Sequence, residues 1–300
     1  MLKVAWSEIY NHPLPEGHRF PMEKYDLLPK QLVYEGTIEE SNLFRPRKLT
    51  EDEILAVHKE HYWNKLQDLD FSRQEERRSG FPITKQLVER EITINAGTIQ
   101  CAEYAFQYGV AMNIAGGTHH AFTDRAEGFC LLNDIAIASR YLLDEGRVSQ
   151  ILVVDLDVHQ GNGTAEIFSK EPKVFTFSMH GEHNYPLNKE TSDLDVPLKD
   201  GTGDATYLTL LEDHLKRLLD TVQPDFIFFQ SGVDVLKTDK LGRLGLSIAG
   251  CKKRDELVLS EAKKNEIPIV ASMGGGYSKD IRDILEAHAN TYRTAQSIFF

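Results

Sequence analysis

The stretch ILVVDLDVHQGNG, residues 151–163, begins with an apolar run and continues into charged and polar residues. Its first four residues are apolar and indicate a buried strand, since near-continuous apolar runs are typical of parallel strands covered on both faces. Asp155, Asp157 and His159 follow at every second position, and an extended backbone would point all three side chains to one side. Two carboxylates and an imidazole at the end of an apolar strand predict a functional site there.

On both sides of this strand, short apolar runs alternate with stretches of helical periodicity along the chain. This alternation predicts an α/β fold in one domain: a mostly parallel, multi-stranded sheet with helices on both faces. The charged, aperiodic residues 67–92 predict a surface excursion near a site entrance. Strands are expected over 110–116, 150–158, 174–179, 225–232 and 268–275, and helices over 136–146, 205–222, 254–265 and 278–296.

The composition excludes some functions. A formal net charge of −12 argues against nucleic-acid binding, which needs a basic surface, and is compatible with a cationic substrate. No run of 18 or more apolar residues occurs, so no membrane span is predicted. The widely spaced Cys101, Cys130 and Cys251 are expected to be free thiols in a reducing compartment, which predicts a cytoplasmic location. The sequence leaves the oligomeric state open.

Polar residues follow each predicted strand. Ligands of open parallel α/β sheets bind beyond the carboxyl ends of the strands, so these residues are expected to form one constellation. They are His119 and His120 after the first strand, Asp155, Asp157 and His159 after the second, His180, His183 and Tyr185 after the third, Asp234 after the fourth, and Gly274, Gly275, Gly276 and Tyr277 after the fifth.

Asp157, His159 and Asp234 form a candidate metal site. Two carboxylates and one imidazole suit Zn²⁺ or another borderline divalent ion, and three protein ligands leave a position open for water. The alternative is that these carboxylates are only helix caps or turn formers at strand ends.

His119, His120 and Tyr277 are candidate catalytic residues. Imidazole suits proton transfer near neutral pH, and the preceding Gly-Gly pair allows both histidines to face a cleft. The GGGY run at 274–277 lacks the lysine of a phosphate-binding loop, and it can place the Tyr277 hydroxyl as a donor to an oxyanion. For the two histidines, the alternatives are a second set of metal ligands or a surface histidine pair. For the GGGY run, the alternative is a tight turn with a packing tyrosine.

Five motifs, GGTHHAF, EGFCLLND, VDLDVHQGNGT, SGVDVL and MGGGY, occur in this order along the chain. Together they resemble the zinc-dependent histone deacetylase superfamily, whose fold is the arginase/deacetylase α/β domain. The resemblance covers nearly the whole chain and implies one deacetylase catalytic domain over residues 1–300. The stretch 239–258 is most similar to the class IV branch.

The resemblance implies a role for each matching residue. Asp157, His159 and Asp234 match metal ligands, with Zn²⁺ expected and Fe²⁺ as the alternative. His120 matches the general base that later acts as the acid, and Tyr277 matches the group that polarises the scissile carbonyl. Further matches are Asp155 as the carboxylate that orients His119; Gly128, Phe129, Tyr185 and Gly275 as the substrate channel; Asp155, Asp157, His159, Ser178 and Met179 as a K⁺ or Na⁺ site; and Arg19 as an arginine of an inner product channel.

Asn162 departs from the best-known branch, where an aspartate supports the second histidine. A neutral amide stabilises an imidazolium less than a carboxylate does, so His120 is expected to have a lower pKa than in aspartate-bearing relatives.

The implied activity is removal of acetyl or longer fatty acyl groups from lysine side chains of a protein or peptide. A second possibility keeps the fold and replaces the substrate by acetylpolyamines or other small acylated amines. An arginase-like dinuclear hydrolase needs extra carboxylates near His119, where the chain has THHAF. A non-catalytic acyl-lysine reader predicts loss of Tyr277 or of a metal ligand, and all of these residues are present.

Overall fold

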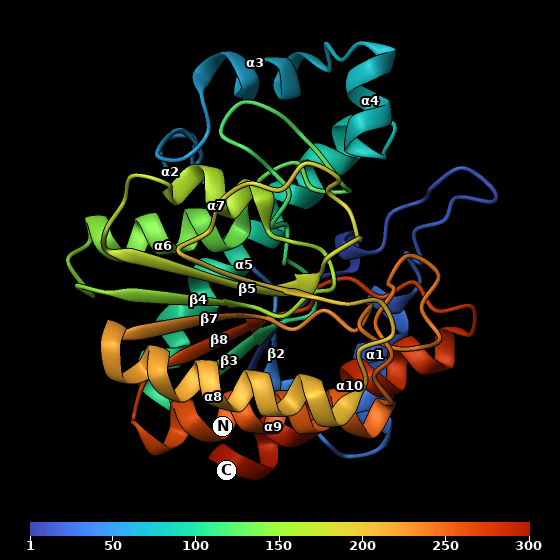
Figure 1. The fold of residues 1–300 in the computed structure, drawn as a ribbon. Helices are drawn as coiled ribbons and strands as arrows, with labels where there is room; N and C mark the ends of the chain where they lie inside the picture. The colour runs from blue at the N-terminus through green and yellow to red at the C-terminus, as the bar shows by residue number, and fades with distance from the viewer.

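The computed structural model describes residues 1–300 and contains one sheet of eight strands (Figure 1). Every neighbouring pair is parallel, in the order β2-β1-β3-β8-β7-β4-β5-β6. The predicted α/β fold with a parallel sheet is confirmed. The strands are β1 (Lys3–Ala5), β2 (Leu43–Phe44), β3 (Val110–Asn113), β4 (Ile151–Asp155), β5 (Val174–Gly181), β6 (Leu194–Leu198), β7 (Phe226–Gln230) and β8 (Ile269–Ser272).

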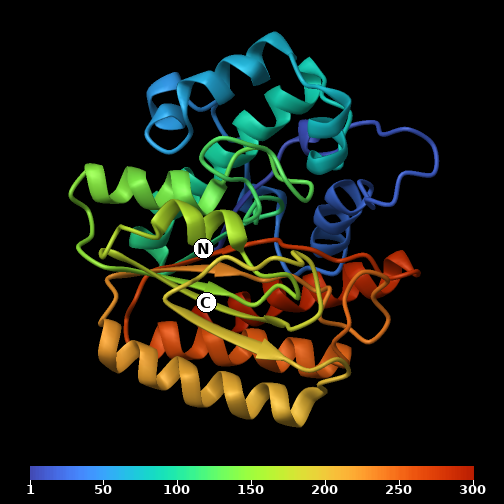
Figure 2. The same ribbon diagram turned by 45° about the horizontal axis from the view of Figure 1, so that its top comes forward.

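Helices cover both faces of the sheet, as predicted. Figures 1 and 2 show α5, α6 and α7 on one face and α8, α9 and α10 on the other, while α2, α3 and α4 form an outer layer beyond α5. The helices are α1 (Lys24–Tyr34), α2 (Glu51–Leu55), α3 (Glu60–Asp68), α4 (Arg73–Ser79), α5 (Lys85–Tyr108), α6 (Asp134–Asp144), α7 (Asn162–Phe168), α8 (Asp204–Val222), α9 (Ile248–Lys264) and α10 (Ile281–Phe299), with the 3₁₀ helices η1 (Glu8–Tyr10) and η2 (Glu40–Asn42).

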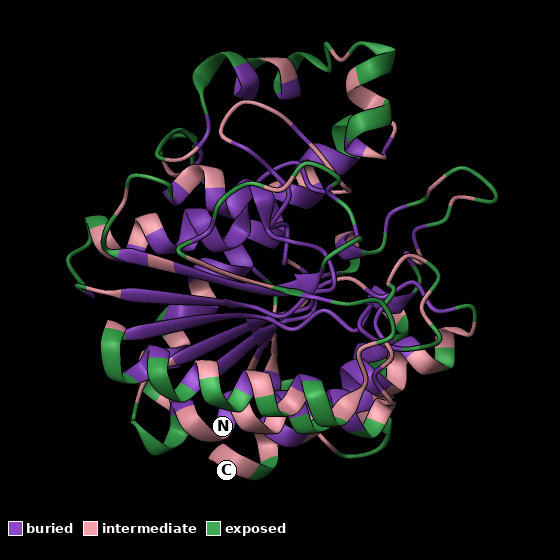
Figure 3. Cartoon of the chain, viewed as in Figure 1, coloured by how far each residue is buried: buried purple, intermediate pink, exposed green.

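The core lies between the sheet and its helices. Every residue of β3, β4, β7 and β8 is buried (Figure 3), which explains their near-continuous apolar sequences. On α8, Tyr207, Leu211, Leu215 and Leu218 recur every three or four residues and form the buried face of the helix. None of the helices combines the length and the apolar character that a membrane crossing requires.

Four of the five predicted strands end earlier than predicted. β4 stops at Asp155, so Asp157 and His159 lie in the following loop and not on the strand. β3, β7 and β8 also lose residues at their carboxyl ends. β5 is the exception, because it reaches Gly181, two residues beyond the prediction. Most of the side chains expected to form the site are therefore carried by loops at one edge of the sheet, whereas Asp155 lies on β4 and Ser178, Met179 and His180 lie on β5.

The prediction for residues 67–92 was partly wrong. The segment contains the surface helix α4, and its last residues begin α5, a largely buried helix of 24 residues. The prediction missed α5 because polar residues such as Glu91, Asn95 and Thr98 on its buried side blur the apolar periodicity.

Candidate functional site

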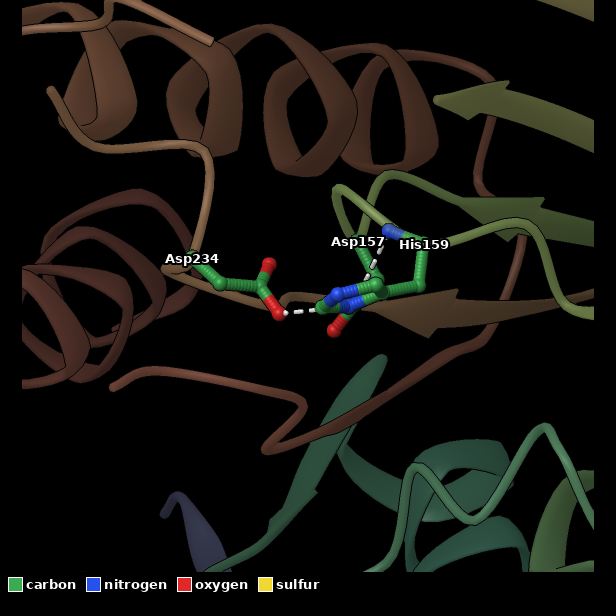
Figure 4. Close-up of side chains that lie close together, drawn as sticks. All are labelled: Asp157, His159 and Asp234. Atoms are coloured by element: carbon green, nitrogen blue, oxygen red, sulfur yellow. Dashed lines mark hydrogen bonds and ion pairs between the residues drawn. The ribbon is translucent and has the colours of Figure 1, made fainter. Parts of the chain in front are cut away.

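Asp157, His159 and Asp234 converge at the carboxyl ends of β4 and β7 (Figure 4). All three are buried, and one ligand atom from each lies within 4.8 Å of the others. The Nδ1 atom of His159 lies 3.0 Å from Oδ1 of Asp157 and 3.1 Å from Oδ2 of Asp234. The structure thus brings together the three residues predicted to hold a metal.

Backbone amides hold both carboxylates. The N–H of Gly275 donates to Oδ2 of Asp157 at 2.8 Å, and the N–H of Val158 donates to Oδ1 of Asp234 at 2.9 Å. Such contacts fix the orientation of metal ligands. A Cβ at position 275 would overlap the Asp234 carboxylate, so Gly275 supports the cluster as well as lining the cavity.

The pKa values of the cluster fit a site for a cation. Burial and the Asp157 charge raise the pKa of Asp234 to about 7. Burial opposes charge on His159, but the two carboxylates outweigh it and raise the pKa of His159 to about 10. The three side chains therefore retain a proton between them, and a divalent ion would take the place of that proton. The donor set, one imidazole nitrogen and two carboxylate oxygens, suits Zn²⁺ and Fe²⁺.

His119 and His120 face the same site from the turn after β3. Gly116 and Gly117 have φ values of +77° and +66°, and the two imidazole centroids lie 4.1 Å apart. Nδ1 of His119 donates to Oδ2 of Asp155 at 2.7 Å, which is the predicted pair. Burial opposes the charged form of His119, but Asp155 outweighs it and raises the pKa.

His120 is held by Asn162, also as predicted. Its Nδ1 donates to Oδ1 of Asn162 at 2.6 Å, which leaves Nε2 as the acceptor. Burial, together with the nearby His119 and His159, lowers the pKa of His120 well below its usual value. His120 is therefore neutral at pH 7 and able to accept a proton.

Glu127 is a site residue that the sequence reasoning missed. Its Oε1 accepts from Nδ2 of Asn162 at 2.8 Å and from the hydroxyl of Tyr185 at 2.5 Å. Its side chain is only 12% exposed. The Glu127 carboxylate thus contacts the Asn162 amide, which in turn contacts His120. It lies within the EGFC motif, but nothing in the sequence indicates that residues 127, 162 and 185 meet.

Tyr277 follows β8 and reaches the cluster through the glycine run. Its ring centroid lies 6.4 Å from that of His159, and the side chain is buried. Oδ2 of Asp239 accepts the backbone N–H of Tyr277 at 2.6 Å, which fixes the turn. Burial and the Asp234 charge raise the pKa of Tyr277 well above 10, so its hydroxyl remains a hydrogen-bond donor.

Two cavities meet at the cluster. An outer cavity of 360 Å³ and an inner cavity of 40 Å³ share a set of lining residues. The predicted channel residues Gly128, Phe129 and Tyr185 line the outer cavity, and Gly275 lines the inner one. The shared residues are His120, Gly128, Phe129, His159 and Tyr277.

Phe129 adopts a strained backbone conformation at the cavity wall. Its φ of +67° is rare for a residue with a side chain, and such strain persists only where the surroundings enforce it. Here the end of α4 does so: the N–H of Phe129 donates to the carbonyl of Ser79 at 2.6 Å, and that of Gly128 donates to the carbonyl of Arg78 at 3.0 Å.

The structure places Arg19 elsewhere than predicted. Its guanidinium lies 5.0 Å from the centroid of Phe129 and lines the outer cavity, not the inner one. Lys24 and Arg90 are the cations of the inner cavity. Nζ of Lys24 donates to the carbonyl of Gly274 at 3.2 Å, and burial lowers its pKa to about 8. In the sequence both residues resemble surface charges, so no pattern identified them.

The residues predicted to bind K⁺ or Na⁺ lie at the carboxyl ends of β4 and β5. Asp155 and Ser178 are register partners there. Both oxygens of Asp155 already accept hydrogen bonds, from the backbone of Asp157 and from His119. The monovalent site stays a prediction. Of the other candidates, His183 is exposed and lies 3.2 Å from Asp200, away from the cluster.

A parallel sheet with a buried Asp–His–Asp cluster at its carboxyl edge defines an α/β protein with a candidate metal centre. Residues 18–292 match the model of the histone deacetylase domain, and the chain belongs to the histone deacetylase family. It is therefore a hydrolase of the deacetylase type, from a family that generally uses a catalytic metal.

Similar proteins cover the whole chain. An uncharacterized protein of Picosynechococcus sp. is 42% identical over 99% of both chains. Histone deacetylase 2 of Arabidopsis thaliana is 31% identical over 87% of this chain and 70% of its own length. Among solved structures, a histone deacetylase homologue complexed with SAHA gives a TM-score of 0.85 at 27% identity, covering 99% of this chain and 84% of the homologue.

Proposed function

We propose that the chain is a metal-dependent lysine deacylase that removes small acyl groups such as acetyl. The observation that carries this proposal is the convergence of the Asp157–His159–Asp234 cluster with His120 and Tyr277 where the two cavities meet. The similarity of residues 239–258 to the class IV branch supports a place in that branch.

Asp157, His159 and Asp234 would hold the ion, for which we propose Zn²⁺, with Fe²⁺ as the alternative. Such an ion lowers the pKa of a bound water and polarises the amide carbonyl. His120 accepts the proton of the attacking water at Nε2, because Nδ1 is occupied by Asn162. It then returns this proton to the leaving amine. Tyr277 donates its hydroxyl proton in a hydrogen bond to the developing oxyanion.

The two cavities suit the two parts of an acylated lysine. The alkyl stem would occupy the outer cavity between Phe129 and Tyr185, and the acyl group would point into the inner cavity. An inner cavity of 40 Å³ has room for a few water molecules, and the charges of Lys24 and Arg90 line it. This favours acetyl over a long fatty acyl group, which would need the cavity to widen against two buried cations.

The test is hydrolysis of one lysine peptide bearing acetyl, octanoyl or myristoyl, followed by mass spectrometry. We expect cleavage by the Zn²⁺-loaded protein, fastest for acetyl, and a loss of about 10²–10³-fold in kcat for Tyr277→Phe. The matched control is Tyr292→Phe, since the Tyr292 hydroxyl is buried outside both cavities and donates to the carbonyl of Asn113. This variant should keep its activity.

Absence of cleavage of every peptide by metal-loaded protein would refute the proposal. Acetylpolyamines and other small acylated amines would then be tested with the same variants. Equal losses in both tyrosine variants would show that removal of a buried hydroxyl lowers activity through the fold, and not through a contact of Tyr277 with the substrate.

A further inference from the structure

Three arginines line the outer cavity and a fourth lines the hollow beside it, and we call these four the arginine rim. Arg19 comes from the loop before α1, and Arg73, Arg77 and Arg78 come from α4. Arg19, Arg77 and Arg78 line the outer cavity, and Arg73 and Arg77 line a neighbouring hollow of 460 Å³. All four side chains are exposed.

None of the four arginines has a carboxylate within ion-pair distance, although the chain has 46 acidic and 34 basic residues. The two acidic residues of α4 are otherwise engaged. Glu75 pairs with Lys65, and Glu76 accepts the backbone N–H of Ile83 at 3.2 Å. No aspartate or glutamate lines the outer cavity. The site mouth is therefore locally cationic on an acidic protein.

The rim is fixed relative to the reaction site. The backbone carbonyls of Arg78 and Ser79 accept the N–H groups of Gly128 and Phe129, which form the cavity wall. The loop before α1, which carries Arg19, contacts the same helix end, since Nε2 of His18 lies 2.9 Å from the carbonyl of Gly80. Arginines in the last turn of a helix also interact favourably with its dipole, but this does not explain Arg19, which lies on no helix.

From this placement we infer that the rim selects acyl-lysine segments that carry aspartate or glutamate next to the acylated lysine. The inference rests on the proposed deacylase function and names its substrate class. Guanidinium groups bind carboxylates in a bidentate manner, and several pairs can form at once. Acetylpolyamines and lysine-rich segments would bring cations against the rim, so both are disfavoured substrates.

The experiment compares three acetyl-lysine peptides that differ only in their flanking residues: aspartate, alanine or lysine. Two or three exposed ion pairs together predict about a tenfold higher kcat/KM for the acidic peptide than for the neutral one. The basic peptide should be the poorest substrate. The preference should shrink at about 1 M salt, where the Debye length is about 3 Å.

The double variant R77Q/R78Q should bring the acidic-to-basic ratio of kcat/KM close to one. The matched control is Arg217→Gln, since Arg217 is exposed on α8, on the opposite face of the sheet, and likewise lacks a carboxylate partner. It removes the same kind of charge and should keep the ratio. Equal or faster cleavage of the basic peptide, or an unchanged ratio in R77Q/R78Q, would overturn the inference.

Binding of the same peptides, measured by fluorescence anisotropy, separates this inference from the proposed function. Tighter binding of the acidic peptide without hydrolysis would sustain the rim and refute the deacylase. Equal binding of all three peptides would overturn the rim even where hydrolysis occurs.

Discussion

Glu127 is linked to His120 by the Asn162 amide, and we predict that its charge supports the activity of His120. An amide has one donor end and one acceptor end, whereas a carboxylate only accepts. Glu127 therefore binds Nδ2 of Asn162 and turns Oδ1 toward His120, which fixes the proton on Nδ1. Loss of the Glu127 charge should weaken this arrangement without touching the metal ligands.

The magnitude follows from the hydrogen bond that is changed. Hydrogen bonds to charged groups contribute about 1.5–3 kcal/mol and neutral ones about 0.5–1.5 kcal/mol. Glu127→Gln should thus cost about 1 kcal/mol at the Asn162 contact, or about fivefold in kcat with little change in KM. Arg125→Gln removes a partner of the other Glu127 oxygen, Oε2, and serves as the control, because Arg125 lines neither cavity and its loss leaves the Asn162 contact intact.

Asn162→Asp tests the same contact from the other side. It places two buried carboxylates where the Nδ2 to Oε1 distance is 2.8 Å, and their repulsion should cost about 2 kcal/mol, or about thirtyfold in kcat. In the double variant E127Q/N162D the introduced amide can donate to the introduced carboxylate, so activity should recover above that of N162D.

In E127Q/N162D a carboxylate would also face His120 directly and raise its pKa. Because His120 must be neutral to accept a proton, the acidic limb of the pH–rate profile should move to higher pH than in the wild type. Steady-state kinetics of the four proteins completes the cycle. Losses that simply multiply in the double variant would refute the proposed chain from Glu127 to His120.

Three further predictions concern the rest of the molecule. Chelation of the metal should abolish activity and lower the melting temperature, and added Zn²⁺ should restore both. The reason is that an ion at 100 times its Kd stabilises the fold by about 2.7 kcal/mol. Identical melting with and without Zn²⁺ would contradict the metal site. Gly128→Ala should lower kcat/KM at least about tenfold, because a Cβ there would lie 2.5 Å from Cδ2 of His120, whereas Gly146→Ala, with φ of +61° and no neighbour within 4 Å, should not. His58 donates from Nδ1 to the Phe122 carbonyl and accepts the Asn133 N–H at Nε2, and burial lowers its pKa to about 4. In the unfolded chain this imidazole has an ordinary pKa near 6.5 and takes up a proton first as the pH falls, so stability is lost between about pH 6.5 and 4. In urea unfolding, the metal-free wild type should lose about 2 kcal/mol more of its free energy of unfolding than His58→Gln between pH 7 and 5. Equal losses in the two proteins would contradict this.

The sequence predicted those parts of the fold whose periodicity is dictated by burial. The five strands from β3 to β8 that were predicted are apolar because helices cover both their faces. The edge strand β2 and its neighbour β1 have two and three residues, too few to show any alternation. On α5, Arg90 and Glu91 pair with each other in the interior, so buried charges there resemble a surface segment.

The candidate site was predictable where one residue type carries the chemistry by itself. Asp157, His159 and Asp234 follow strand ends, and parallel strands bring their carboxyl ends to one edge. Glu127, Lys24 and Arg19 depend on loops and on a short helix whose paths no local pattern specifies. Their positions follow from contacts between distant segments, such as that of α4 with the wall at Phe129.

The aspartates at the strand ends accept backbone N–H groups as well as facing the site. Asp155 accepts the backbone N–H of Asp157 with one oxygen and His119 with the other. Asp234 likewise accepts the N–H of Val158 with Oδ1 and faces His159 with Oδ2. Asp155 therefore forms the turn that ends β4, whereas Asp234 joins the loop after β7 to the loop after β4, and each presents its second oxygen to the site. An alanine at either position would remove a backbone contact and a functional group together, so variants at Glu127 or Tyr277, whose side chains hold no backbone N–H, separate catalysis from folding more cleanly.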